Sequence, residues 1–220
     1  MAETAVVTAR GLGLRTRRGW VFRDVDLDVY PGELVALTGA AGSGRTSLLL
    51  ALAGRFATNR GTLHRDGSAA LGYVAGAADP EAGLTVAEHV EERLLLVGRA
   101  PWRRSARRRL VAECLAAGGY DGEPDRLVRD LDTYHRHRLG LVLARAEQPA
   151  LVVVDDVDAD LSSAERDELW QALRTLAGEG VAVVAACREL DPAVPDRTLT
   201  MPDRTMPDRT MPDRTMEVTR

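Results

Sequence analysis

The sequence predicts an α/β fold built on a mostly parallel sheet. Short apolar runs at 34–37, 151–154 and 181–186 have the length of buried strands. Segments with helix-forming composition separate them, among them 134–147 and 163–177. Strands that alternate with helices in this way are typical of a parallel sheet covered by helices. A chain of 220 residues is long enough for one large domain with a substantial core.

The amino-terminal part predicts further strands. Segments 4–10 and 20–29 have strand character, and apolar residues alternate with aspartates through 24–29, as on a half-buried strand. Pro31-Gly32 predicts a turn before the first buried strand. The region 61–75 predicts two more short strands.

Two helices are expected at 85–98 and 103–118, with Thr85 as the amino-terminal cap before Glu88. Arginines gather around Pro101-Trp102, between and within these helices. They are a solvated helix surface or a docking surface for acidic lipid headgroups or a membrane subunit, and both interpretations stay open. The cluster comprises Arg99, Arg103, Arg104, Arg107, Arg108 and Arg109.

Composition narrows the class of protein. The net charge of −4 gives no general reason to expect nucleic-acid binding. No apolar run reaches the ~18 residues of a membrane span, and the first residues lack a secretion pattern. We therefore expect a cytoplasmic protein that, if it serves a membrane process, docks on a separate membrane subunit. Cys114 and Cys187 are expected to be reduced core thiols.

The carboxyl-terminal segment is of low complexity. PDRT occurs at 195–198, 202–205, 207–210 and 212–215. Proline at every fifth residue blocks a long helix or a regular central strand. We interpret residues 201–220 as an expanded surface turn that follows a domain of residues 1–200.

A glycine-rich loop lies between the strand at 34–37 and a helix at 46–54. It matches G-x-x-x-x-G-K-[ST] except that arginine replaces lysine, in a chain whose 29 basic residues are all arginine. Glycines let backbone N–H groups converge on phosphate oxygens, and the following helix adds its positive end. Residues expected to bind the nucleotide phosphates are Gly39, Ala40, Ala41, Gly42, Ser43, Gly44, Arg45, Thr46 and Ser47.

A second phosphate-site element follows the strand at 151–154. Asp155 stands at its carboxyl end, where sheets of this type bind ligands. Thr46 offers a hydroxyl and Asp155 a carboxylate to Mg²⁺. The cofactors expected are therefore ATP and Mg²⁺.

Over about residues 5–200 the chain resembles the ATP-binding subunits of ABC transporters. Four segments carry the resemblance: VFRDVDLDVYPGELVALTGAAGSGRTSLLLALAGR, GLTVAEHV, LDTYHRHRLGLVLARAEQPALVVVDDVDADLS and VPDRTLTM. The arginine-containing loop with TSLLLALAGR is similar to a divergent actinobacterial branch. The resemblance implies a P-loop NTPase of ABC type, with an N-terminal antiparallel β subdomain and an inserted helical subdomain at about 77–140. It implies a cytoplasmic subunit, peripheral on the inner face of the cell membrane, that works with a transmembrane subunit.

This family hydrolyses ATP between two such domains, in a homo- or heterodimer. The P-loop of one domain faces the signature sequence of the other. Aligned with the family, the chain departs at several positions: Arg45 for the P-loop lysine, Gly76 for the Q-loop glutamine, Leu131-Asp132-Thr133-Tyr134-His135 for the signature LSGGQ, Asp156 for the catalytic glutamate, Val157 for the following proline, Ser162 for the D-loop aspartate, Arg188 for the switch histidine, and Thr16, with Trp20 nearby, for the base-stacking aromatic.

These departures predict weak catalysis, with Asp156 and Arg188 at the catalytic positions. Asp156 is one methylene shorter than glutamate, and a displacement of about 1 Å can cost about 100-fold in rate. Tyr134 adds bulk where backbone N–H groups approach the partner's nucleotide, and Asp132 repels its γ-phosphate. Arg188 cannot accept a hydrogen bond as a neutral histidine can.

The sequence thus predicts an ATP-binding transporter subunit with slow or absent hydrolysis on its own. The alternative is a non-hydrolysing regulatory or scaffold partner of a membrane protein or of an intact ABC subunit. A soluble ABC protein of DNA repair or translation is less consistent with the chain, since such proteins usually carry two cassettes or long coiled-coil insertions.

Overall fold

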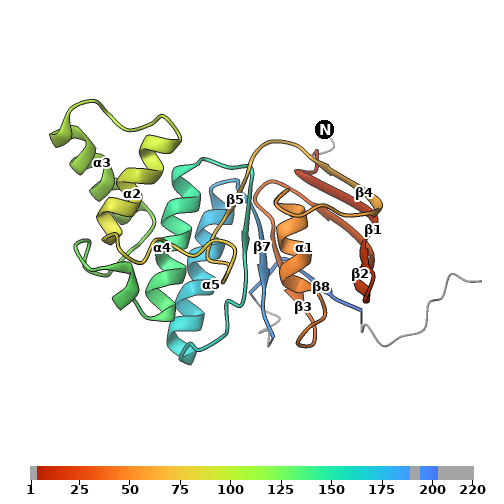
Figure 1. The fold of residues 1–220 in the computed structure, drawn as a ribbon. Helices are drawn as coiled ribbons and strands as arrows, with labels where there is room; N and C mark the ends of the chain where they lie inside the picture. The colour runs from red at the N-terminus through yellow and green to blue at the C-terminus, as the bar shows by residue number, and fades with distance from the viewer. Residues whose placement is uncertain (1–3, 189–193, 203–220) are drawn as a thin grey trace, which may run out of the picture.

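The computed structural model describes residues 4–188 and 194–202, and Figure 1 shows their arrangement. Two sheets form the scaffold. The antiparallel sheet has the order β2-β1-β4 and the parallel sheet the order β5-β6-β7-β3-β8. The strands are β1 (Val7–Thr16), β2 (Gly19–Val29), β3 (Leu34–Thr38), β4 (Arg60–Arg65), β5 (Ala69–Leu71), β6 (Leu151–Val154), β7 (Ala182–Ala186) and β8 (Arg197–Thr200). The α/β fold with an antiparallel β subdomain is therefore confirmed.

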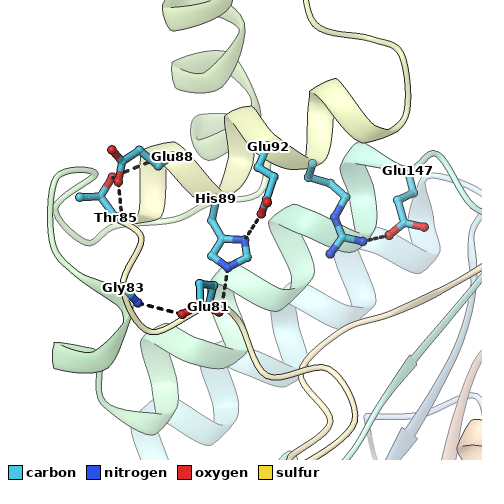
Figure 2. Close-up of polar contacts among 8 residues, drawn as sticks. Glu81, Gly83, Thr85, Glu88, His89, Glu92 and Glu147 are labelled. Atoms are coloured by element: carbon cyan, nitrogen blue, oxygen red, sulfur yellow. Dashed lines mark hydrogen bonds and ion pairs between the residues drawn. The ribbon is translucent and has the colours of Figure 1, made fainter.

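The helices lie close to their expected positions. Thr85 caps α2 in a reciprocal capping box with Glu88, as predicted (Figure 2). The strand expected at 4–10 instead begins at Val7 and continues to Thr16, because its pairing with β2 continues through several register shifts. The helices are α1 (Arg45–Leu52), α2 (Val86–Leu96), α3 (Arg104–Ala117), the 3₁₀ turn η1 (Val128–Asp130), α4 (Thr133–Ala146) and α5 (Ser163–Gly178).

The parallel sheet is buried on both faces, which explains its uninterrupted apolar strands. Val35 and Leu37 of β3 join a core that includes α1 and the antiparallel sheet. Their neighbours Leu34 and Ala36 join a second core with α4 and α5. Successive side chains of a strand point to opposite faces, so a strand covered on both sides has no polar face.

A helical layer of α2, α3 and α4 has a core of its own. In this layer, α2 and α3 lie at the end of the molecule away from the antiparallel sheet, and α4 lies between them and the parallel sheet (Figure 1). Its attachment is specific. The backbone N–H of Glu81 donates to Nε2 of His89 at 2.6 Å, and Arg93 of α2 pairs with Glu147 after α4 (Figure 2). The first contact joins the segment that follows β5 to α2, and the second joins α2 to the carboxyl end of α4.

Both cysteines are free, Cys187 buried and Cys114 half-buried. Among the described residues, no helix is long and apolar enough to cross a bilayer. The segment VPDRTLTM provides β8, which pairs with β3 in parallel. The later PDRT copies, from residue 203 onward, lie outside the described residues.

Candidate functional site

The glycine-rich loop joins β3 to α1 at the carboxyl edge of the parallel sheet. Gly42 and Gly44 have φ of +76° and +96°, a backbone region that favours glycine. A Cβ on Gly44 would lie 2.3 Å from the carbonyl oxygen of Val21, because the backbone of β2 packs directly against the loop. The tight course of the loop therefore depends on tertiary contact as well as on sequence.

The start of α1 is open to an anion. Gly44 is the N-cap, and no side chain caps the first turn. Ser43 is 4% exposed, and its hydroxyl has no hydrogen-bond partner within the residues that the structure describes. Uncapped N–H groups at the positive end of a helix are suited to phosphate oxygens. These features fit the phosphate cradle that the sequence predicts.

Arg45 is buried, with 8% exposure, and reaches across the ends of three strands. Nη1 donates to the carbonyl oxygens of Gly39 at 2.9 Å and Cys187 at 2.5 Å. Nη2 lies 3.7 Å from Oδ1 of Asp156. The guanidinium thereby links residues that follow β3, β6 and β7. A lysine ammonium, a compact point charge, could not make this planar bridge.

Thr46 and Asp155 meet beneath the loop. The Thr46 hydroxyl donates to Oδ2 of Asp155, and the Asp156 N–H donates to Oδ1 at 2.9 Å. Asp155 is 6% exposed, and this burial raises the pKa of its carboxyl above the ordinary value. The hydrogen bond from Thr46 lowers the pKa but does not cancel the effect of burial. A hydroxyl and a carboxylate side by side are hard oxygen donors, the type that Mg²⁺ prefers. This pair fits a magnesium site.

The carboxylate of Asp156 lies between two arginines. Oδ1 is 3.7 Å from Nη2 of Arg45 and 3.9 Å from Nε of Arg188. Asp156 has φ of +45°, a conformation uncommon for a residue with a side chain. The backbone N–H of Arg188 donates to Asp158 at 2.8 Å, which holds the end of β7 to the loop after β6. Both expected catalytic positions therefore lie beside the phosphate loop.

The segment aligned with the family signature begins α4, and α4 packs on the face of the sheet opposite α1. Leu131 is buried, and Thr133 is the first residue of the helix. Asp132 caps the helix and accepts from the N–H of His135 at 2.8 Å and from its ring at 2.7 Å. Although burial raises the pKa of Asp132, these hydrogen bonds outweigh it and lower the pKa.

The expected obstruction by Tyr134 is not what the structure shows. Its side chain is 6% exposed and its hydroxyl donates to Glu168 of α5 at 2.8 Å. The bulk of the ring is therefore buried between α4 and α5, where it stabilises the packing of the two helices. The repulsive charge of Asp132 remains, but it is partly balanced by hydrogen bonds.

Other expected substitutions have local structural functions. Gly76 has φ of +74° and donates its N–H to Asp79 at 2.8 Å, so the position aligned with the family's glutamine is part of a turn. Ser162 caps α5 in a capping box with Glu165. The guanidinium of Arg15 lies 5.4 Å from the centre of the Trp20 ring.

Thr16 closes the hairpin between β1 and β2 by donating its hydroxyl to the carbonyl of Gly19 at 3.1 Å. Two contributors to the site were not expected from the sequence, the carbonyl groups of Val21 and Cys187. Every residue has a backbone carbonyl, so residue types do not indicate which carbonyl will reach a site. Only the packing of β2 and β7 against the loop brings these two carbonyls to it.

Comparison with known proteins places this geometry in a family. The sequence matches the ABC transporter family over residues 22–159. It is 33% identical over 201 residues to the cytochrome c biogenesis ATP-binding export protein CcmA of Bordetella parapertussis, covering 85% of this chain and 86% of the relative. It is 28% identical over 206 residues to the hemin import ATP-binding protein HmuV of Gloeobacter violaceus, covering 86% and 74%.

An uncharacterised ABC transporter ATP-binding protein of Mycobacterium tuberculosis is 34% identical over 192 residues. The match covers 82% of this chain but only 26% of that relative. Among solved structures, the ATP-binding cassette MJ0796, in a dimeric post-hydrolysis state bound to ADP and phosphate, has a TM-score of 0.77 at 20% identity. The overlap covers 89% of this chain and 94% of that one. The chain belongs to the ABC transporter family, as one of its ATP-binding domains.

Proposed function

We propose that this domain binds Mg-ATP at the loop of Gly39–Ser47 and couples nucleotide binding to a transmembrane transport subunit. The observation that carries the proposal is that the first turn of α1, which no side chain caps, contains Thr46, and that the Thr46 hydroxyl contacts the Asp155 carboxylate. Phosphate oxygens would take N–H groups of the loop, and Thr46 and Asp155 would hold the metal. Bound Mg²⁺ would neutralise charge on the phosphates.

Arg45 gives the site a distinct electrostatic character. Its guanidinium already donates hydrogen bonds to two backbone carbonyls. To contact a γ-phosphate, it would have to use its remaining N–H groups or break these two hydrogen bonds. Because a buried carbonyl left without a partner is costly, we expect Arg45 to act mainly as a support for the loop. The affinity for nucleotide should survive this change better than the rate of hydrolysis.

Slow hydrolysis is supported by the surroundings of Asp156. Its carboxylate is shorter than that of glutamate and is directed toward Arg45 and Arg188. A carboxylate held between two cations is poorly placed to align a water molecule and accept its proton. Arg188 offers the γ-phosphate a charge but has no acceptor atom.

The family resemblance supports a dimer in which the segment Leu131–His135 faces the nucleotide of a second domain. The dimer would be homomeric or would include an intact ABC subunit. The hemin import and cytochrome c biogenesis proteins support an assembly with membrane subunits, on the cytoplasmic side of the membrane. In a homodimer, altered residues on both sides would meet in each site, so catalysis would be very slow.

Steady-state ATPase rates test which step fails. The variants are Asp156→Glu, Arg45→Lys and replacement of residues 131–135 by LSGGQ, singly and together. Because these groups act on one γ-phosphate, the combined variant should recover much more activity than the single variants do. Turnover of the unaltered chain near ~1 per second, typical of working enzymes, would contradict the proposed slow hydrolysis. Absence of any calorimetric or thermal-shift response to millimolar Mg-ATP would contradict nucleotide binding itself.

A non-hydrolysing regulatory or scaffold function is the second candidate. It is favoured by the same two ion pairs of Asp156, together with the structural use of Tyr134 and of Asp132. Assays of ATP binding and turnover in the presence of co-purifying partners distinguish the two candidate functions. Retained ATP binding without stimulation of turnover supports the scaffold function, whereas stimulated turnover that falls in Asp156→Asn supports the transporter ATPase.

A further inference from the structure

Residues 93–112 differ in charge from the rest of the chain. The segment contains seven arginines and neither aspartate nor glutamate, although the whole chain has a net charge of −4. It covers the end of α2, the connection to α3 and most of α3. We call its outer part, residues 95–109, the α2–α3 tip. Such segregation of positive charge favours an anionic partner.

The α2–α3 tip also exposes large apolar side chains. Trp102 is 95% exposed, Leu96 75% and Leu95 55%, the three highest values among large apolar side chains of the described residues. Leu95 and Leu96 are consecutive residues, and Trp102 lies in the connection six residues later. Several exposed large apolar groups in one short segment indicate a contact surface more than a single one does. The tip therefore combines bulky apolar groups with cations.

Specific contacts hold this connection in place. Arg107 pairs with Glu91 of α2 at 2.7 Å and donates to the carbonyl oxygens of Pro101 and Trp102 at 3.4 and 3.2 Å. Arg99 donates to the carbonyl of Ala146, the last residue of α4, at 2.8 Å. With its backbone tied inward by these arginines, the connection presents the Trp102 ring to solvent.

Three arginines of the tip are exposed and form no ion pair with any residue that the structure describes: Arg103, Arg104 and Arg108. Their charge is available to an external anion. The tip lies at the outer end of the helical layer, away from the antiparallel sheet (Figure 1). Contact there leaves the phosphate loop uncovered.

We infer that the α2–α3 tip binds the headgroup region of an anionic lipid bilayer directly. Tryptophan and leucine beside arginine match the chemistry of this interface, where apolar groups enter the acyl boundary and guanidinium groups contact lipid phosphates. A nucleic acid would match the arginines but offers the leucines no aliphatic surface, and the test below distinguishes a soluble acidic partner from the bilayer. This binding goes beyond the proposed ATPase function and requires neither nucleotide nor a transmembrane subunit.

Vesicle flotation of the full chain tests the inference. Vesicles of phosphatidylcholine with phosphatidylglycerol should carry the chain, whereas phosphatidylcholine alone should not. Binding should be lost at ~1 M salt, where the screening length is only about 3 Å. Changing Arg103, Arg104 and Arg108 together to glutamine should weaken binding about 100-fold, at about fivefold for each charge. Trp102→Ser should weaken it roughly tenfold, as expected for losing a buried apolar side chain.

A matched control carries the same charge change elsewhere. Arg17, Arg18 and Arg60 are exposed residues of the antiparallel sheet and its hairpin, at the opposite end of the molecule. Changing these three to glutamine should leave vesicle binding within about twofold of the unaltered chain. A blue shift of tryptophan emission on vesicle binding should disappear in Trp102→Phe.

Three results would overturn the inference. The first is no flotation with anionic vesicles at low salt. The second is equal loss of binding in the control triple variant, which would indicate a general charge effect. The third is binding that does not change in Trp102→Ser and is competed by heparin, which would assign the arginines to a soluble acidic partner.

Discussion

Gly44 offers the sharpest test of the phosphate loop, because the chain contains a matched control. Gly44 and Gly180 have nearly the same φ, +96° and +93°. A Cβ on Gly180 meets no atom within 4 Å, whereas one on Gly44 would lie 2.3 Å from the carbonyl oxygen of Val21. Alanine at either position therefore has the strain of a positive φ, and only Gly44→Ala adds a clash with backbone.

The strain of a non-glycine residue in this region is about 1–3 kcal/mol. For a chain of this size, 1 kcal/mol shifts the melting temperature by about 2–4 °C. Gly180→Ala should therefore lower it by about 2–12 °C and keep the stabilisation by Mg-ATP, which is about 2.7 kcal/mol at ~100 times Kd. Gly44→Ala should melt at least about 4 °C lower than Gly180→Ala, because β2 or the loop must move, and should lose the response to Mg-ATP.

Thermal unfolding of both variants with and without Mg-ATP is the assay. Calorimetric titration well below the melting temperatures separates loss of binding from loss of folding. If Gly44→Ala is as stable as Gly180→Ala and binds Mg-ATP normally, the close approach of β2 does not determine the shape of the loop. That outcome would refute the reasoning.

Further predictions follow from single contacts. His137 is 1% exposed, and burial lowers its pKa from 6.5 to about 4. The unfolded chain then binds the proton more readily than the folded chain, so the free energy of unfolding should fall by about 3 kcal/mol as the pH drops from 6.5 to 4. Urea titrations at several pH values measure this fall, and it should be absent in His137→Leu. Tyr134→Phe should lower the free energy of unfolding by about 1–2 kcal/mol through loss of its bond to Glu168, with nucleotide affinity unchanged in calorimetry. Thr46→Val should remove the magnesium dependence of ATP affinity, measured by titration with and without the metal; an unchanged dependence would contradict the magnesium site.

Much of the fold could be predicted from local patterns. The loop from Gly39 to Thr46 stands between a buried strand and a helix, as its sequence predicts, and Thr85 caps α2 through Glu88. The apolar run at 151–154 forms a central strand that delivers Asp155 to the loop. The elements themselves depend on neighbouring residues, so composition and spacing are sufficient to identify them. The contact between Asp155 and Thr46 joins residues 109 positions apart and forms only because β6 and β3 belong to one sheet. The roles of the site residues in nucleotide chemistry remain predictions.

The directions of side chains could not be predicted in this way. The sequence predicts that Tyr134 obstructs a partner site, yet its side chain is buried against α5, where Glu168 accepts its hydrogen bond. Arg45 aligns with a lysine, yet its guanidinium also donates to the carbonyl of Cys187, 142 residues away. The first contact forms because α5 packs beside α4, and the second because β7 lies beside β3.

The sequence by itself determined the order of strands and helices, the glycine-rich loop between a strand and a helix, and the two residues expected to hold Mg²⁺, Thr46 and Asp155. The tertiary structure decided the strand order β5-β6-β7-β3-β8, the closure of β2 on Gly44, and the exposure of Trp102. The physical reason is the range of the interactions. Turns, caps and periodicity depend on residues within a few positions of one another, whereas burial and side-chain partners depend on segments that meet only when the sheets and helices pack.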